Sequence, residues 1–527
     1  MKNKNKQFTK IVNEVSTKTS EAIKQFSNLD LVLEVDDINN DSEYDLSLRL
    51  KSISKNSYLN ETLGTEIAEV MKKNMYYYFN EIEYITKRML DNFIEDSSLG
   101  LLFNNVDLSH PDNHDHIFRF VNFLQDISIK TYETTPINLG IFIMENMLKI
   151  NERFEELQIE YLPIEHKIYI EELINQEKPL IKLINSKSFA LVLDKDFYVI
   201  GFARKIKDKK SIEDIVLNNY FDIEYELFCH YSMSYIKDLV GYSYKEHIDE
   251  ITEKVITSSK DDDNTSCLTK ETSDAFIKLL ENYREEFHKK LEDYLNTYKN
   301  ETSDHIKYIR ICSTEIQWYF NNNYVLTMKN GKWRLKHFIL LSSYIFEYLH
   351  IPDIALLKIL NEPSDLAQYV SQEIYKVFKL ISIIRQMSEQ NIGGLFIILK
   401  SNTDDEELNK ADIYNHIPKD MIKISTTANY YKSLIWDKTN KCMSIDEIDS
   451  YILSLVAGVD GATVLDNNLN ILTYGEIVNN KNVDTQNKSF GARTNAAISA
   501  SVHGLAIKIS EDGDIELFKD KSLIFKI

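Results

Sequence analysis

Apolar residues recur at three- and four-residue intervals through much of the first 155 residues, with charged residues between them. The stretch "GTEIAEVMKKNMYYYFNEIEYITKRMLDNFIED", residues 64–96, shows this spacing and predicts amphipathic helix. A further helix is predicted over "TTPINLGIFIMENMLKINERFEEL", with Thr135 as the N-cap and Pro136 at the first helical position. The pattern therefore predicts a mainly helical N-terminal domain over residues 1–155.

The pattern changes to a mixed one between residues 156 and 350. "KSFALVLDKDFYVIGFARKI" predicts two strands around the turn "DKD", and "EIQWYFNNNYVLTMKNGKWRLKHF" predicts strands with a turn at Asn330-Gly331. Helical stretches lie between them. We expect a mixed α/β domain here, which fits a sensing or dimerisation module and fits a scaffold nearly as well.

The last part of the chain, residues 351–527, has the most regular pattern. Ser364 is placed to cap a helix through "LAQYVSQEIYKVFKLISIIRQMSEQ", and "NIGGLFIILK" then predicts a buried strand. In "SIDEIDSYILSLVAG", Ser444 and Glu447 have the spacing of a capping box, and Gly458 ends the predicted helix.

The remaining segments predict a sheet. "GATVLD" and "LNILTY" form a hairpin about Asn467-Asn468, "GARTNAAISAS" a short helix, and "GLAIKIS", "DIELF" and "LIFKI" further strands. The fold class predicted for the chain is α/β: a C-terminal mixed sheet flanked by helices, preceded by the helical domain and the mixed domain.

Length and charge narrow the function classes. A chain of 527 residues exceeds one ordinary core, so two or three domains are expected. The net charge of −21 disfavours a nonspecific grip on nucleic acid or anionic lipid, which both need a basic face. The apolar stretch "HFILLSSYIFEYLHIPDIALLKIL" is interrupted by Glu347, Pro352 and Asp353, so it predicts buried helices and not a membrane span.

The N-terminus lacks the apolar region of a signal peptide. The four cysteines are too far apart in sequence to suggest a zinc or redox pair, and single thiols fit a reducing compartment. We expect a cytoplasmic protein without nucleic-acid or membrane partners. One histidine-rich segment, "SHPDNHDHIFRF", could hold a metal, but a solvated loop that caps the next helix is the simpler interpretation.

Glycine is rare in this chain and concentrated near its end. Only 14 residues of 527 are glycine, and six of these lie between residues 458 and 513. Glycine is needed where φ is positive or where backbone must approach another group closely. The concentration indicates a turn-rich sheet, a ligand site, or both.

Three glycine-containing segments carry candidate chemistry. Asp460 lies between two glycines at a strand entry, where a carboxylate can hold a divalent metal or orient a hydroxyl; an Asx-turn is the alternative. In "FGARTNAA", Gly491 and Ala492 open a helix whose N-terminus suits phosphate, and Arg493 adds a bidentate donor, although an ordinary helix start with a solvated arginine has the same sequence.

The third segment is "SEDGD", residues 510–514. It places acidic side chains on a turn between strands, and a plain solvated hairpin has the same sequence. None of the three segments is specific alone, but their order and spacing are specific together.

The run "DGATVLD…LNILTYGEIV…FGARTNAA…LAIKISEDGDIELF" resembles the diadenylate cyclase (DAC) domain, the catalytic domain of DNA-integrity scanning proteins and their relatives. That family carries Asp-Gly-Ala, a glycine after the hairpin, Gly-Thr-Arg-His-Arg-Ala-Ala, and Ser-Glu-Glu-x-Gly. "RQMSEQNIGGLFIILK" resembles the helix and first strand of the family. The resemblance covers roughly residues 365–527, and the long preceding region is similar to the sensor-fused branch of the family.

The resemblance implies a reaction. Each domain would bind one ATP, two domains would pair face to face in a homo-oligomer, and each 3′-hydroxyl would attack the other α-phosphate to give cyclic di-AMP and two pyrophosphates. It implies Asp460, Arg493 and Glu511 as catalytic residues, with Asp460 and Glu511 beside Mg²⁺ or Mn²⁺. The nucleotide-binding residues it implies are Gly461, Ala462, Gly475, Gly491, Ala492, Thr494, Asn495, Ser510 and Asp512.

The sequence departs from the family where its Thr-Arg-His-Arg becomes Ala492-Arg493-Thr494-Asn495. One phosphate-binding guanidinium and an imidazole are missing, and Thr494 and Asn495 bring hydrogen bonds but no charge. Lys481 or Lys488 could supply the missing charge. Two further interpretations therefore stay open: a nucleotide-binding regulatory protein with the same fold and no catalysis, and a helical scaffold.

Overall fold

A computed structural model gives the structure of the chain. It describes residues 17–27, 31–37, 44–50, 67–71, 74, 86–103, 111–132, 134–144, 146–177, 179–232, 235–236, 307–312, 314–319, 325–351, 366–400, 417–425, 431–438, 441–479 and 491–527. The chain forms two compact units: Met1–Tyr225 with Thr302–Ile339 and Ile527, and Glu226–Glu301 with Leu340–Lys526. They are called here the N-terminal unit and the C-terminal unit, and each is described by itself.

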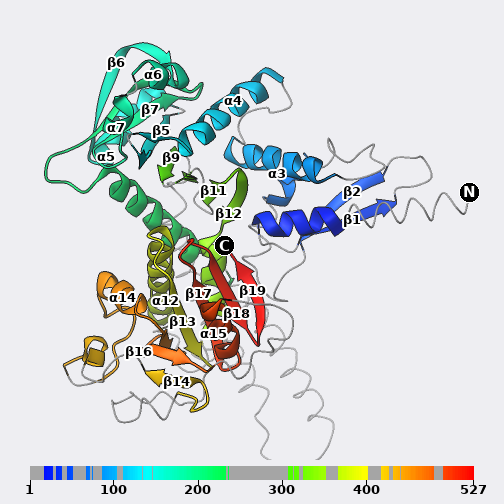
Figure 1. Cartoon of the computed structure of the whole chain (residues 1–527), viewed down its shortest axis with the longest axis vertical. Helices are drawn as coiled ribbons and strands as arrows, with labels where there is room; N and C mark the ends of the chain where they lie inside the picture. The colour runs from blue at the N-terminus through cyan, green and yellow to red at the C-terminus, as the bar shows by residue number, and fades with distance from the viewer. Residues whose placement is uncertain are drawn as a thin grey trace, which may run out of the picture. The chain divides into compact units, whose positions relative to one another are not determined.

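The N-terminal unit is built on an eight-stranded mixed sheet with the order β12-β11-β10-β9-β5-β7-β8-β6 (Figure 1). Its strands are β5 (Leu139–Met144), β6 (Ile159–Tyr169), β7 (Phe189–Asp194), β8 (Tyr198–Lys205), β9 (Lys307–Cys312), β10 (Glu315–Tyr319), β11 (Val325–Lys329) and β12 (Lys332–Lys336). Strands β5 and β7 are parallel, and every other neighbouring pair is antiparallel. Two small hairpins are separate from this sheet: β1 (Leu31–Asp37) with β2 (Tyr44–Leu50), and β3 (Thr131–Tyr132) with β4 (Thr135–Pro136).

The helix predicted from Thr135 is wrong over its first half. Pro136 lies in the short strand β4, and the apolar run that follows it is β5, a fully buried strand at the centre of the sheet. Helix begins only with η1 (Met147–Lys149) and α5 (Ile150–Glu156). A short apolar run does not distinguish a buried strand from a helix, because both bury every side chain. The boundary expected at residue 155 therefore falls inside this sheet unit.

Both hairpins predicted in this unit are confirmed. Strands β7 and β8 flank the turn at residues 195–197, and β11 and β12 flank Asn330-Gly331, where both residues have positive φ, 53° and 69°. That pair of angles fits the type I′ turn for which Asn-Gly is preferred. The sequence signal was strong here because the turn geometry itself selects the residues.

Helices accompany the sheet of the N-terminal unit. They include α3 (Lys87–Leu102), α4 (Pro111–Ser128), α6 (Ile170–Gln176), α7 (Leu180–Leu183) and the first part, residues 212–225, of a helical segment that continues to residue 232. The helical pattern predicted over residues 64–96 is confirmed where the structure describes it, at residues 67–71 and 74 and in α3, which begins after Thr86 and is capped by its hydroxyl. The histidine-rich segment is not a loop in its described part, because α4 already begins at Pro111.

The C-terminal unit is built on a seven-stranded mixed sheet, order β14-β16-β15-β13-β17-β18-β19 (Figure 1). Its strands are β13 (Gly394–Leu399), β14 (Ile422–Ser425), β15 (Ala462–Leu465), β16 (Ile471–Val478), β17 (Gly504–Ile509), β18 (Ile515–Lys519) and β19 (Ser522–Lys526). Strands β13 and β15 are parallel and the other pairs antiparallel. The predicted strands and the mixed α/β fold class are confirmed.

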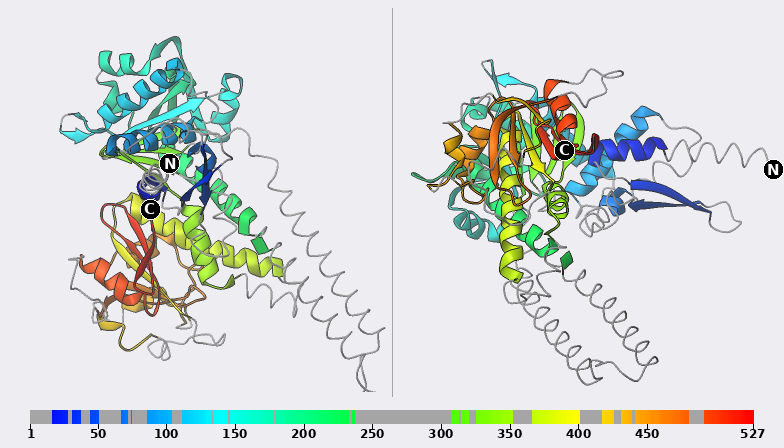
Figure 2. Two further views of the ribbon diagram at one scale, coloured as in Figure 1. Left: turned by 90° about the vertical axis from the view of Figure 1, so that its right-hand side faces the viewer. Right: turned by 90° about the horizontal axis from the view of Figure 1, so that it is seen from below.

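Helices cover both faces of this sheet, as Figures 1 and 2 show for α12 (Leu366–Glu389) and α15 (Ala492–Ala500). One apolar core joins Ala497 and Ala500 of α15 to Ile397 and Val464 of the sheet. Further helical elements are α10 (Phe338–Tyr348), η3 (Tyr431–Ile435) and α14 (Ser450–Ala457). Among the described residues, no helix is both long and apolar enough to cross a membrane.

The predicted start of α14 is wrong by five residues. Ser444 N does donate to Glu447 Oε2 at 3.1 Å, but this bond closes a turn, and the helix begins at Ser450 with Asp449 as its N-cap. Asp449 Oδ1 accepts from two backbone N–H groups of the first turn. Asp and Ser are comparable N-caps, so tertiary packing decided between them. The predicted end at Gly458 is confirmed.

A partly buried acidic side chain connects the last three strands. Glu516 on β18 accepts hydrogen bonds from Lys508 on β17 at 2.7 Å and from Lys526 on β19 at 3.0 Å. Burial opposes ionisation, but these two hydrogen bonds and charges outweigh it and lower the pKa of Glu516 below its ordinary value. The carboxylate is therefore a stabilising part of the folded C-terminal unit.

Candidate functional site

The sheet register brings the predicted site segments to one edge of the C-terminal unit, the edge formed by the ends of the strands and not by an outer strand. Strands β13 and β15 are parallel and start at this edge, while β16 and β17 run antiparallel to them and end there: Gly394 pairs with Ile509, and Ala462 pairs with Glu476. Asp460 precedes β15 and "SEDGD" follows β17. Segments more than 50 residues apart in sequence therefore meet where the strands begin and end.

Arg493 lies at this edge and contacts two of the other segments. Its guanidinium covers Gly393, where an added Cβ would lie 2.9 Å from Arg493 Cζ. Arg493 Nη1 also lies 3.6 Å from Glu511 Oε1, and the exposed fractions of the two side chains are 32% and 78%. The absence of a side chain at residue 393 thus lets a partly exposed arginine lie flat beside an exposed carboxylate.

Asp460 lies on the loop that enters β15 and is exposed. Gly458, the residue at which α14 ends, lies against the side chain of Ile392, since an added Cβ would be 3.2 Å from Ile392 Cγ2; Arg493 covers the next residue, Gly393. The end of α14 and Arg493 therefore lie against neighbouring residues before β13.

Gly461 and Gly475 are required by the sheet itself. Both have positive φ, 116° and 68°, and a Cβ on Gly461 would lie 2.6 Å from the carbonyl carbon of Gly475. The backbones of β15 and β16 touch here at a register shift between the strands. Close backbone approach explains both glycines without a ligand. Ala462 is fully buried in the core of the unit.

Among the described residues, none covers the N-terminus of α15, which is called open below. Its N-cap, Gly491, provides no side-chain cap, and an added Cβ there would meet no atom of the described chain within 4 Å. Ala492 is exposed and Thr494 half-buried, and Asn495 N closes the first turn onto Gly491 O at 3.0 Å. Unsatisfied N–H groups and the helix dipole favour an anion at such an end, with Arg493 one residue inside it.

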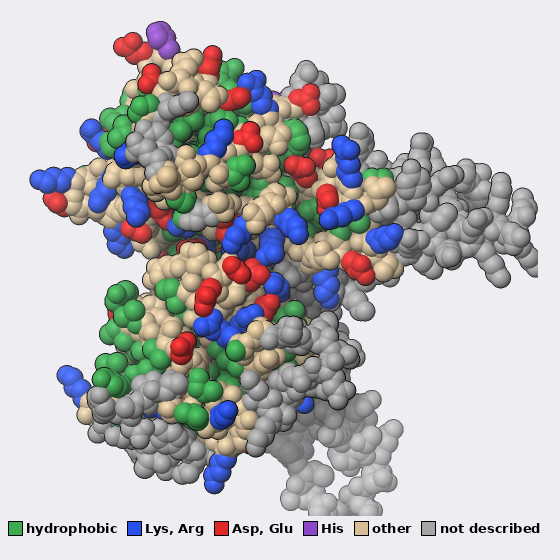
Figure 3. Space-filling model, viewed as in Figure 1, with side chains coloured by type: hydrophobic (Ala, Val, Ile, Leu, Met, Phe, Trp, Pro, Cys, Tyr) green, Lys and Arg blue, Asp and Glu red, His purple; other side chains and the backbone are tan. Residues whose placement is uncertain are grey.

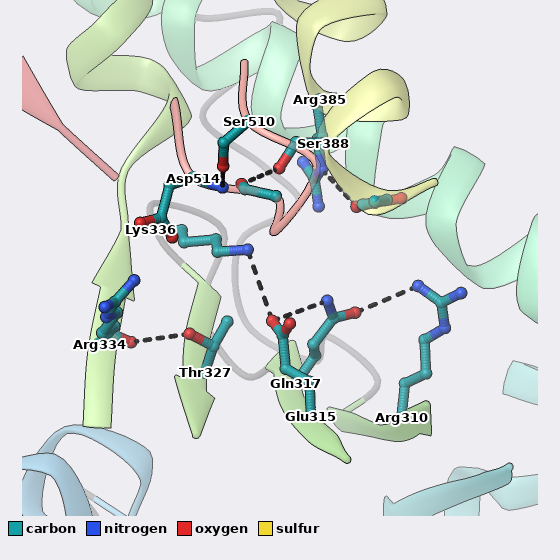
Figure 4. Close-up of polar contacts among 12 residues, drawn as sticks. Arg310, Glu315, Gln317, Thr327, Arg334, Lys336, Arg385, Ser388, Ser510 and Asp514 are labelled. Atoms are coloured by element: carbon teal, nitrogen blue, oxygen red, sulfur yellow. Dashed lines mark hydrogen bonds and ion pairs between the residues drawn. The ribbon is translucent and has the colours of Figure 1, made fainter. Parts of the chain in front are cut away.

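The segment "SEDGD" forms a tight turn whose acidic side chains are exposed. Ser510 Oγ accepts from Asp514 N at 3.0 Å, and Ser388 of α12 donates to Gly513 O at 2.5 Å (Figure 4). Ser510 therefore holds the turn in shape. Glu511 and Asp512 are left on its outer side.

A buried ion pair beside the site had no clear sequence signal. Lys432 of η3 donates to Glu476 of β16 and, at 2.8 Å, to Thr473 Oγ1. Thr473 and Ser425 also donate to Glu476 Oε1, and the exposed fractions of the Lys432 and Glu476 side chains are 2% and 1%. Glu476 directly follows Gly475 and pairs with Ala462, so this pair fixes η3 to the edge that carries the site.

The described residues contain no group of three or more His, Cys, Asp or Glu placed to hold a metal. Asp460 and Glu511 offer two exposed carboxylates at the edge. Mg²⁺ is commonly held by one or two carboxylates together with substrate phosphates, so these two residues suit a metal that arrives with a nucleotide. Lys481 and Lys488 lie outside the described residues.

Apolar side chains are exposed next to the site. Tyr451, Ile452, Leu455 and Val459 are exposed by 64%, 41%, 55% and 38% along α14 and the loop that leads to Asp460. Figure 3 shows hydrophobic side chains gathered over this part of the C-terminal unit. An apolar helix face in this position favours contact with another protein surface. These four residues are called the α14 strip below.

Comparison with known proteins gives limited similarity. No model of a protein family matches the chain, and no curated protein matches it in sequence. A double mutant of DacA from Staphylococcus aureus is 18% identical, over 29% of this chain and 86% of its own, with a TM-score of 0.18. A hypothetical membrane spanning protein from Bacillus cereus is 16% identical, over 36% of this chain and 93% of its own, with a TM-score of 0.20. TM-scores this low do not establish a shared fold or function.

Proposed function

We propose that the C-terminal unit binds the triphosphate of ATP at the sheet edge described above and joins two ATP molecules into cyclic di-AMP. The observation that carries this proposal is the meeting of an open helix N-terminus, a partly exposed arginine and two exposed carboxylates at one edge. This is the combination that phosphoryl transfer uses: anion-binding N–H groups, a cation for the phosphate oxygens, and acidic groups for a metal and a hydroxyl.

Each residue has a defined role in this proposal. The N–H groups of α15 and the guanidinium of Arg493 bind phosphate oxygens, and Arg493 exchanges its weak contact with Glu511 for the ligand. Asp460 accepts a hydrogen bond from the ribose 3′-hydroxyl and takes its proton, and Asp460 and Glu511 would hold Mg²⁺ or Mn²⁺. The metal, when bound, would neutralise charge on the phosphates. A P–O bond forms from each 3′-oxygen to the other nucleotide's α-phosphate while the bond from that phosphorus to the bridging oxygen breaks, and pyrophosphate leaves.

The reaction needs two nucleotides, so two sites must face each other. The α14 strip supports this part of the proposal, because it is apolar, exposed and continuous with the loop that carries Asp460. A second C-terminal unit that covers the strip would bring two copies of the site together in a homo-oligomer. The N-terminal unit, in this proposal, controls that pairing.

A regulatory nucleotide-binding protein is the second candidate. It is favoured by one observation: Thr494 and Asn495 follow Arg493, so α15 brings a single cation to the site. One arginine and a helix N-terminus suffice to bind phosphate, whereas charge stabilisation in the transition state gains from every further cation.

The two candidates differ in turnover. Purified full-length chain is incubated with ATP and Mn²⁺, and the nucleotides are separated by chromatography. Formation of cyclic di-AMP that is lost in Asp460→Asn supports the cyclase. Binding of labelled ATP without product supports the regulatory protein. Absence of both binding and product would refute the nucleotide site itself and leave the scaffold interpretation.

A further inference from the structure

The two units have the same strand topology. Read from one edge to the other, the N-terminal sheet runs β11-β10-β9-β5-β7-β8-β6, with β12 as one additional edge strand next to β11. The C-terminal sheet runs β19-β18-β17-β13-β15-β16-β14. The direction of every neighbouring pair agrees, including the single parallel pair. The order along the chain agrees as well, since the helical segment 212–232 occupies the place of α15.

The central hairpins agree residue by residue. "ALVLDKDFYVI", residues 190–200, aligns with "ATVLDNNLNIL", residues 462–472. Asp194 Oδ1 accepts from the N–H groups two and four residues ahead, at 3.1 and 3.0 Å, and Asp466 Oδ1 does the same at 2.9 and 2.8 Å. The third residue after each aspartate has positive φ, 62° at Phe197 and 60° at Leu469.

The buried faces agree too. The hairpin alignment matches Leu191 with Thr463. Ile141 of β5 pairs with Leu191, and Phe396 of β13 pairs with Thr463, so Ile141 matches Phe396. With this match, the apolar cores on one face of the two sheets contain residues at the same positions. The matched core pairs are Phe142 with Ile397, Ala190 with Ala462, Val192 with Val464, Ile200 with Leu472, Tyr308 with Ala506, and Tyr319 with Phe518. Agreement in topology, turn chemistry and core is what a duplicated fold produces.

The matching site in the N-terminal unit is closed by the chain's own atoms. Ser188 stands at the position of Asp460, and the helix begins directly against the preceding loop: Ile212 N donates to Lys187 O and Glu213 N to Ser186 O, both at 3.0 Å. In the C-terminal unit, residues 479–491 connect β16 to α15, and no described residue lies within 4 Å of a Cβ added at the N-cap Gly491. In the N-terminal unit, residues 206–211 make the connection and the first helical N–H groups are already bonded.

The charge at this place is also reversed. Glu213 lies in the first turn of the helix, where Arg493 lies in α15. Its carboxylate accepts from Ser186 Oγ at 2.9 Å and pairs with Arg310 of β9, and the side chains of Glu213 and Arg310 are each 13% exposed. Arg310 in turn donates to Gln317 at 3.2 Å, which donates to Glu315, the partner of Lys336 (Figure 4). A carboxylate in a closed network repels phosphate.

We propose that residues 111–336 contain a diverged second copy of the C-terminal fold whose phosphate site is closed, so that each chain holds one triphosphate. The evidence that this phosphate site is closed comes from the N-terminal unit alone. Its consequence rests on the proposed function: the second nucleotide must come from a second copy of this chain, and no chain can complete the condensation by itself.

Hydrogen exchange measured by mass spectrometry on the full chain tests the closed site of the N-terminal unit and the nucleotide site of the C-terminal unit separately. Without nucleotide, the amides of Ile212 and Glu213 should be protected and those of Arg493 and Thr494 should exchange rapidly. With a nonhydrolysable ATP analogue and Mn²⁺ at a hundred times the Kd, exchange at Arg493 and Thr494 should slow by up to about a hundredfold. Exchange at Ile212 and Glu213 should not change, and calorimetry should count one nucleotide per chain.

The outcomes separate the two proposals. Three results would overturn the closed second copy. They are rapid exchange at Ile212 and Glu213 without nucleotide, slower exchange at these residues with nucleotide, and binding of two nucleotides per chain. Protection of Ile212 and Glu213 together with unchanged exchange at Arg493 supports the closed copy and removes the proposed function. Arg493→Met provides the control, since at the same ligand concentration it should reduce the slowing in α15 to about tenfold or less and leave exchange at Ile212 and Glu213 as it was.

Discussion

Replacing Arg493 with methionine should weaken nucleotide binding while leaving the fold intact. The methionine keeps an unbranched apolar stem over Gly393, so the contact there is largely retained. The lost pair with Glu511 spans 3.6 Å and involves a side chain that is 78% exposed, and a surface pair of this kind contributes less than about 1 kcal/mol. Stability of the C-terminal unit should therefore change little.

Binding should change more, because the guanidinium is charged and its proposed partner is a phosphate. A hydrogen bond to a charged group contributes about 1.5–3 kcal/mol, and each 1.4 kcal/mol corresponds to a factor of ten, so Kd should rise by about 10- to 150-fold. Isothermal titration calorimetry with a nonhydrolysable ATP analogue and Mn²⁺ measures this. Thermal unfolding of the same samples shows whether the fold is retained.

The matched control is Arg204→Met in the N-terminal unit. Arg204 donates two hydrogen bonds to Glu160 at 2.8 and 2.7 Å, and its side chain is 46% exposed. The substitution therefore removes an exposed arginine–carboxylate pair away from the site. Its Kd for nucleotide should match that of the unmodified chain. If Arg493→Met binds nucleotide within twofold of the unmodified chain, Arg493 does not hold phosphate and the proposed site is wrong.

Lys432→Met should lower the free energy of unfolding of the C-terminal unit by about 3–5 kcal/mol in urea titrations, because the carboxylate of Glu476 stays buried without its cation; an unchanged midpoint would contradict the buried pair. Gly461→Ala should destabilise the same unit by more than about 1 kcal/mol in such titrations, because residue 461 has positive φ and an added Cβ would clash with the backbone of Gly475. An unchanged free energy of unfolding would mean that β15 and β16 can move apart at little cost. The pKa of Glu516 is lowered in the folded unit, so the carboxylate stabilises the fold at pH values above the ordinary pKa of glutamate, and this stabilisation is lost as the pH falls below that value. Glu516→Gln should therefore reduce the loss of unfolding free energy between about pH 5 and pH 3, and parallel curves of unfolding free energy against pH for the variant and the unmodified chain would refute this. Leu455→Asp should shift the chain towards monomer in sedimentation and leave Kd for nucleotide unchanged, whereas an unaltered association state would exclude the α14 strip as the pairing surface.

The predictions that held were those in which local geometry selects the residue. Asn330-Gly331 adopts the positive φ angles that its turn demands, Gly458 ends α14, and the hairpin predicted about Asn467-Asn468 joins β15 and β16. The run "LGIFIM" after Pro136 was misassigned to helix, because an uninterrupted apolar run satisfies either structure when both faces are buried.

The sequence by itself determined the mixed α/β class, the hairpins, and the segments in which unusual residues gather. It could not determine which glycines serve a ligand and which serve the sheet. Gly461 and Gly475 lie against each other's backbone, while Gly393, which the site motifs do not include, makes room for Arg493. Gly393 and Arg493 are 100 positions apart in the sequence, and only the folded sheet brings them into contact.

Tertiary structure alone also decided the relation between the two halves of the chain. Residues 190–200 and 462–472 share a pattern common to many hairpins, so the sequence likeness carries little weight until strand order, register and buried faces are compared. The same comparison distinguishes an open helix N-terminus at Arg493 from one that Ser186 and Lys187 have sealed at Glu213. That difference depends on hydrogen bonds between distant backbone atoms, which no local pattern specifies.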